Sequence, residues 1–131
     1  MKRTLRAGFV YFLIVFTIGF VLGSLRVLVV APRIGELAAV LVELPVMLSA
    51  AWIVCSALTT RFRVARNTRD RIIMGGHALA LLLIAEIALS KFVFGNPMGS
   101  IVAAYLTPHG FVGLCGQLAF AVFPLLQLAR R

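Results

Sequence analysis

The stretch Gly19-Phe20-Val21-Leu22-Gly23-Ser24-Leu25-Arg26 lies near the end of the first long apolar run of the chain. Its two glycines are four residues apart, a spacing that places them on one face of a membrane helix and lets another helix approach closely. Arg26 follows Gly23 by three residues and therefore shares that face. The stretch predicts a first membrane helix whose packing face carries a charge inside the membrane.

The composition predicts a membrane protein built as one domain. The chain has 131 residues, of which 62% are hydrophobic and 13% are charged, and its mean hydropathy is +1.06. A soluble domain of this length could not bury so much apolar surface. We therefore expect a single domain, residues 1–131, with most of its surface facing lipid or other helices.

Four apolar runs are long enough to span a bilayer as helices, which need about 20 residues each. Their bounds are about 7–30, 37–60, 72–94 and 108–128, and Pro32 is expected to end the first. The predicted fold is an all-α integral membrane protein, an antiparallel bundle of four transmembrane helices. Between the third and fourth spans, residues 100–106 can form a short interfacial helix, and Thr107 with Pro108 is typical of a helix start.

The basic residues predict the orientation of the chain. They gather before the first span, between the second and third, and after the fourth, and they give a net charge of +9. Positively charged loops stay in the cytoplasm, so we expect both termini inside and the protein in a bacterial inner (plasma) membrane. The loop Arg61–Arg71 is expected to contact anionic lipid head groups, and this location argues against a nucleic-acid partner.

Charged residues from all four spans fall in the outer half of the predicted membrane region. We expect Arg26 to pair with Glu43 across the first hairpin, with Glu86 close by and His109 above them. The candidate polar cluster consists of Arg26, Glu43, Glu86, His109, Lys91, Arg33 and Glu36. The glycines expected to support helix packing are Gly19, Gly23, Gly113 and Gly116.

Two interpretations of this cluster remain open at the level of sequence. Ionisable groups inside a membrane commonly mark ion, proton or substrate sites. A buried Arg–Glu pair can also serve only to fix which helices pack together and in which register. We also expect Tyr11, Phe62 and Tyr105 to lie in the interfacial aromatic belts.

No pattern in the chain predicts a catalytic centre, a cofactor or a metal. Cys55 and Cys115 are the only cysteines, and they form neither a C-x-x-C motif nor a cluster with histidine. Known nucleophile, P-loop and dinucleotide motifs are missing from the sequence.

Three functions are compatible with this sequence. The first is a non-enzymatic accessory or interaction bundle, with a homodimer or another membrane protein as its partner. The second is a small oligomeric ion or solute transporter or channel that uses Arg26, Glu43 and Glu86. The third is an enzyme that acts on lipid at the outer leaflet. A polar cluster that is open to solvent or lipid would favour a binding role, whereas a sealed cluster would favour a structural one.

Overall fold

The computed structural model describes residues 2–93 and 95–129, except for the side chains of residues 109 and 129, and all its regular structure is helical. Short π-helical segments follow the first and the fourth α-helix. In chain order the elements are α1 (Lys2–Leu25), η1 (Arg26–Val30), α2 (Ala31–Ile34), α3 (Glu36–Arg61), α4 (Thr68–Ala88), η2 (Leu89–Val93), α5 (Met98–Tyr105) and α6 (Pro108–Ala129).

Four helical segments are long and apolar enough to cross a membrane, which indicates a multi-pass membrane protein. They cover Lys2–Ile34, Glu36–Arg61, Thr68–Val93 and Gly110–Leu128. The prediction of four helical spans is therefore confirmed, although Phe94, at the end of the third predicted span, lies outside the described residues. The short helix expected before the last span is present as α5, and the Thr107 hydroxyl caps α6 by accepting from the Gly110 N–H at 3.2 Å.

The expectation that Pro32 ends the first span is wrong, because the helical path continues through α2 to Ile34. Proline has no N–H to donate to the carbonyl four residues earlier. The chain adapts by widening into the π-helical η1, where the Ala31 N–H bonds to the Arg26 carbonyl, and this places Pro32 in the first turn of α2. Gly35, with φ of 88°, then reverses the chain directly into α3.

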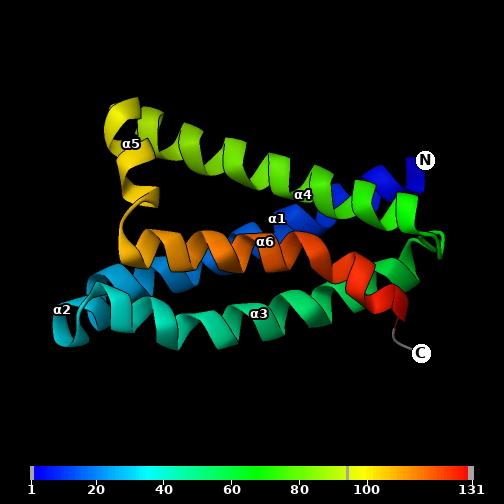
Figure 1. Cartoon of the computed structure of the whole chain (residues 1–131), viewed down its shortest axis with the longest axis horizontal. Helices are drawn as coiled ribbons and strands as arrows, with labels where there is room; N and C mark the ends of the chain where they lie inside the picture. Colours follow the sequence, from blue (N-terminus) through cyan, green and yellow to red (C-terminus); the bar gives the residue numbers. More distant parts are fainter. Residues whose placement is uncertain (1, 94, 130–131) are drawn as a thin grey trace.

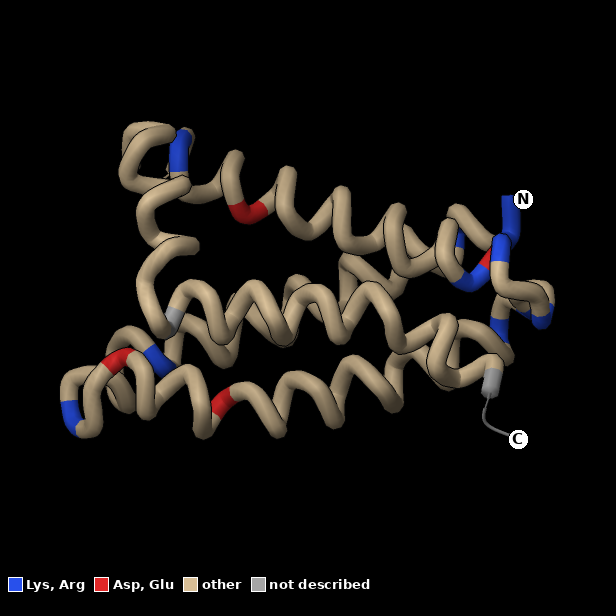
Figure 2. The backbone as a smooth tube through the Cα atoms, viewed as in Figure 1, with Lys and Arg blue, Asp and Glu red and all other residues tan. Residues whose placement is uncertain are grey.

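Consecutive long helices run in opposite directions and lie in a ring (Figure 1). Helix α1 packs against α3 and α4, and α6 packs against the same two helices from the other side. Lys and Arg residues gather at the end where α1 begins and α6 ends, which we call the basic end (Figure 2). The opposite, distal end carries α2 and α5, and α5 contacts α6 and η2 there.

The apolar core is concentrated toward the basic end. In α1 the buried residues extend from Thr4 only to Val15, and no described residue beyond Val15 in that helix, in η1 or in α2 is buried. From α4 the core includes Met74, Ala78 and Leu82. The four helices are therefore tightly packed at the basic end and less so toward the distal end.

Tyr11 connects α1 to α6 inside this core. Its side chain is fully buried, its ring stacks on Phe120 with centroids 4.2 Å apart, and its hydroxyl donates to the Phe120 carbonyl at 2.7 Å. That carbonyl lacks its usual helical donor because Pro124, four residues later, has no N–H. Tyr11 is thus a core residue that completes the α6 backbone, and the expectation that it lies in an interfacial belt is wrong.

Two helix backbones approach each other closely at Gly75. A Cβ atom at this position would overlap the Ala121 carbonyl of α6. Gly8 of α1 is similarly close to α4, since a Cβ there would lie 2.9 Å from the Met74 carbonyl oxygen. These small residues set how closely α4 packs between α1 and α6.

Substitution of the adjacent glycines Gly75 and Gly76 by alanine should have opposite effects. Gly75→Ala should destabilise the protein by about 1–3 kcal/mol, because the methyl group must displace the α6 backbone. Gly76→Ala should leave stability unchanged or slightly raised, because nothing lies within 4 Å of its Cβ position and alanine favours helix. Thermal unfolding in one detergent measures both, and equal effects of the two substitutions would contradict this packing.

Candidate ligand-binding cavity

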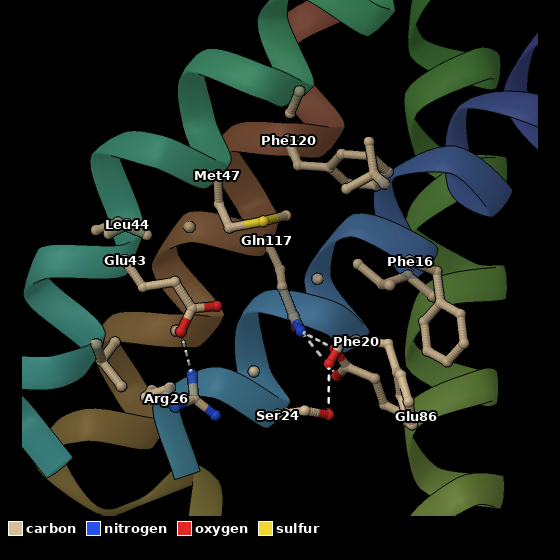
Figure 3. Close-up of a pocket in the computed structure, with 18 of the residues that line it drawn as sticks. Phe16, Phe20, Ser24, Arg26, Glu43, Leu44, Met47, Glu86, Gln117 and Phe120 are labelled. Carbon is tan, nitrogen blue, oxygen red and sulfur yellow. Dashed lines mark hydrogen bonds and ion pairs between the residues drawn. The ribbon is translucent and has the colours of Figure 1, made fainter. Parts of the chain in front are cut away.

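A cavity of about 650 Å³ occupies the space between the four long helices on the distal side of the core (Figure 3). Its walls are mainly apolar and include Phe16 and Phe20 of α1, Leu44 and Met47 of α3, and Phe120 of α6. Its polar lining comes from every long helix or its π-helical extension, through Ser24, Arg26, Glu43, Glu86 and Gln117. Three of the residues expected to cluster, Arg26, Glu43 and Glu86, therefore line an open volume.

The path of α1 creates this volume. At the basic end α1 lies beside α4, and toward the distal end it crosses to the side of α3 (Figure 1). Phe16 and Phe20 lie where α1 and α4 diverge (Figure 3), and 48% of the surface of Phe20 is exposed. The floor of the cavity is the core itself, because Val15, Ala51, Leu82 and Phe120 belong to both. The cavity is thus bounded by the core on the basic side and by Phe20 where α1 leaves α4.

The four glycines expected to support close helix packing lie at the cavity. The atoms nearest to a Cβ placed at Gly19, Gly23 or Gly116 belong to side chains, and none belongs to the backbone of another helix. All four glycines, including Gly113, line the cavity. A Cβ at Gly113 would meet nothing within 4 Å, and one at Gly116 would meet only the flexible Leu44 side chain. The expectation that these glycines support helix packing stays a prediction; here they border the cavity, where larger side chains would fill space.

Arg26 and Glu43 form the ion pair expected across the first hairpin. Arg26 Nη1 lies 2.9 Å from Glu43 Oε2, and the side chains are 32% and 15% exposed. The single-residue reversal at Gly35 makes the two helices neighbours, so both residues reach the cavity from adjacent walls (Figure 3). The pair leaves the Arg26 charge compensated within the wall.

Glu86 has different partners, which the sequence did not predict. Gln117 Nε2 donates to Glu86 Oε1 at 2.6 Å and to Oε2 at 2.7 Å, and the Tyr105 hydroxyl donates to Oε2 at 3.2 Å. Gln117 follows Gly113 by four residues and so shares its helix face. A polar amide inside an apolar span is the sequence feature that could have predicted its role at this site. The oxygen of this amide, Gln117 Oε1, is buried and has no hydrogen-bond partner among the described residues.

Three further members of the predicted cluster, Arg33, Glu36 and Lys91, do not line the cavity. Arg33 and Glu36 are exposed beside the Gly35 reversal, and the exposed Lys91 has its Nζ 5.5 Å from the ring centroid of Phe92. The side chain of His109 lies outside the described residues. The charges brought together in the cavity are therefore those of Arg26, Glu43 and Glu86.

Comparisons of the chain with protein-family models, curated proteins and solved structures give no match. Within the described residues, no group of three or more His, Cys, Asp or Glu side chains is arranged to hold a metal ion. Both cysteines are free thiols, with Cys55 buried and Cys115 exposed. The cavity thus brings the Glu86 carboxylate and the Gln117 amide together within mainly apolar walls.

Because Arg26 and Glu43 form an ion pair, the effects of substituting them on the stability of the protein should be coupled. Arg26→Gln and Glu43→Gln should each destabilise the protein, because either change leaves a charge without its partner. The double variant should lose less than the sum, with a coupling free energy of about 0.5–3 kcal/mol, as for residues in direct contact. Thermal unfolding of the four proteins in one detergent measures this cycle, and strictly additive losses would show that the side chains do not interact.

Tyr105 should titrate at unusually high pH. Burial, the negative charge of Glu86 and the hydrogen bond to it raise the pKa of Tyr105 to about 12, above the usual value of about 10. The neutral phenol therefore contributes stability that is complete below pH ~10 and is lost as pH rises through about 12.

A variant with one tyrosine makes this titration visible. The chain has two tyrosines, so Tyr11→Phe leaves tyrosinate absorbance to Tyr105 alone. Adding Glu86→Gln should lower the pKa of Tyr105, whereas adding Glu43→Gln should not. A titration near pH 10 in the protein that retains Glu86 would contradict the contact.

Proposed function

We propose that the chain is an antiparallel four-helix bundle in a bacterial inner membrane, with both termini in the cytoplasm. The basic end shown in Figure 2 supports this orientation, because positively charged segments are retained on the cytoplasmic side. In this orientation the distal cavity belongs to the outer half of the membrane. The bundle then offers a binding volume to molecules from the outer leaflet or the external solution.

The proposed activity is the binding and transport of an apolar ammonium compound. The observation that carries this proposal is the buried Gln117 Oε1, which has no partner among the described residues and belongs to the amide that binds Glu86. Leaving such an acceptor unsatisfied costs about 1–3 kcal/mol. An ammonium group in the cavity can donate to Glu86 and, once the Gln117 amide rotates, to this oxygen, while an apolar body fills the space between Phe16, Phe20 and Met47.

The charges of the lining favour a cation over an anion. Arg26 is already paired with Glu43 at 2.9 Å, so an anion would have to displace Glu43. Glu86 has hydrogen-bond donors but no ion pair among the described residues. With all three groups ionised, the cavity carries one excess negative charge, which a monovalent cation would neutralise.

The closed core on the basic side of the cavity supports a carrier that opens to one side at a time. Apolar amines concentrate in the bilayer and could enter where Phe20 marks the divergence of α1 and α4. In the proposed cycle, Glu86 holds either the ligand cation or a proton, so release and protonation are linked. Opening toward the cytoplasm would require Tyr11 to separate from Phe120, because their contact lies between the cavity and the basic end.

Binding of a phenylbutylammonium ion to the purified protein tests the ligand class. The primary ammonium should bind, whereas the alcohol lacks the charge and the N-trimethyl analogue lacks the N–H donors. Glu86→Gln should weaken binding by about tenfold to a hundredfold, the loss expected for a hydrogen bond to a charged group. Isothermal titration in neutral micelles measures all three compounds, and equal affinity for the three would contradict the proposed recognition.

A pair of glycine substitutions separates occupation of the cavity from general effects on folding. Gly113→Leu should abolish binding by filling the cavity, whereas Gly76→Leu should leave it unchanged. Neither glycine has a neighbour within 4 Å of its Cβ position, and Gly76 lies on the exposed surface of α4. Ammonium uptake driven by a pH gradient in proteoliposomes should follow the same order. Binding without uptake would limit the function to binding, and loss of both together with a specific co-purifying membrane protein would favour the accessory role.

A further inference from the structure

We propose that a second pocket, at the basic end, binds the phosphate group of an anionic lipid or of a soluble phosphate compound. This pocket has a volume of about 470 Å³ and lies among the end of α3, the α3–α4 connection, α4 and the end of α6. Its polar lining consists of three arginines and three hydroxyl residues, Arg63, Arg66, Arg71, Ser56, Thr59 and Thr60, together with Gln127. It shares no lining residue with the distal cavity, so the proposal does not depend on the ammonium site.

Two of the arginines are held in place by backbone carbonyls. Arg71, only 4% exposed, donates from Nε to the Ala65 carbonyl at 3.3 Å and from Nη1 to the Pro124 carbonyl at 3.1 Å. Arg66 donates from Nη2 to the Leu128 carbonyl at 3.0 Å. A guanidinium has five N–H donors, so these bonds fix both groups and leave further donors for a ligand.

Among the described residues, no carboxylate forms an ion pair with these arginines. The chain has four acidic residues, and only Asp70 belongs to the basic end. Its N–H is capped by the Asn67 side chain, and none of the three arginines forms an ion pair within the described residues. Three cations around one polar volume repel one another, and a bound anion would remove this repulsion.

Arg63 is held in a backbone conformation that is unfavourable for a residue other than glycine. It has a positive φ of 52° at the end of α3, where the Val64 N–H bonds to the Thr59 carbonyl at 3.0 Å and the Arg63 N–H to the Thr60 carbonyl at 3.3 Å. This Schellman arrangement favours glycine at the residue with positive φ. An arginine there is conformationally unfavourable, and retained strain of this kind is a pointer to function.

A purely structural role explains only part of the arrangement. Cationic side chains at a helix C-terminus stabilise its last carbonyls and its dipole, and this accounts for the Arg66 and Arg71 contacts with α6. It does not account for Arg63, whose exposed side chain makes no such contact with a described residue, or for the polar volume between the three arginines. Several guanidinium groups and a hydroxyl such as that of Ser56 match the tetrahedral oxygens of phosphate.

The test compares two arginine substitutions that remove the same charge from the same end. Arg63→Gln removes a pocket side chain, and Arg69→Gln removes an exposed arginine that does not line the pocket. Isothermal titration at fixed salt uses three probes, namely short-chain phosphatidylglycerol, inorganic phosphate and a short alkyl carboxylate. We expect Arg63→Gln to weaken phosphate binding about tenfold, the size of one charge-assisted hydrogen bond, and Arg69→Gln to change it little.

Arg63→Gly separates the ligand role from a role in folding. Glycine relieves the positive φ, so this variant should unfold at the same or a higher temperature while it loses phosphate affinity as Arg63→Gln does. Tighter binding of the lipid than of inorganic phosphate identifies a head group as the source, and the reverse identifies a soluble phosphate compound. Equal losses from Arg63→Gln and Arg69→Gln, equal binding of the carboxylate, or no binding of either phosphate probe would overturn the proposal.

Discussion

The hydrogen bond from the Tyr11 hydroxyl to the Phe120 carbonyl holds the packed half of the molecule together. The distal half has no equivalent contact between α1 and α6 among the described residues. Pro124 deprives the Phe120 carbonyl of its helical donor, and an unsatisfied carbonyl in an apolar interior is costly. Tyr11 supplies the missing donor from α1, the helix diagonally opposite α6 in the ring. The contact joins all four long helices into one core, because α3 and α4 pack against both partners.

The cavity begins where this core ends, beyond Val15 of α1. Beyond Val15, α1 turns away from α4, and glycines on α1 and α6 supply no side chains to fill the space. The polar residues around it then fall into two sets with different consequences. Arg26 and Glu43 satisfy each other, whereas the Glu86–Gln117–Tyr105 set leaves the amide oxygen of Gln117 without a partner among the described residues. This asymmetry is why the cavity is proposed as a cation site.

The sequence predicts those features that depend on a single helix or a short connection. Hydropathy locates the four spans, and the short link near Gly35 makes the first two helices neighbours, which is sufficient to anticipate the Arg26–Glu43 pair. The partner of Glu86 depends instead on the rotation of α4 relative to α6, which is set by the close contact between Gly75 and Ala121. The same limit applies to the glycines at 19, 23, 113 and 116, because spacing alone cannot distinguish a face that packs closely from one that borders a cavity. The continuation past Pro32 depends on a local π-helical turn that hydropathy does not encode.

The native methionines can show directly whether a packed core lies beside an accessible cavity. Met47 lines the cavity, Met74 is fully buried in the core, and Met98 on α5 is 45% exposed. In the unmodified protein labelled at its methionine methyl groups, a lipid-soluble paramagnetic probe should broaden the NMR signals of Met47 and Met98 and leave that of Met74 sharp. A Met47 signal protected to the same degree as that of Met74 would show that the distal half is closed and that the cavity is not accessible.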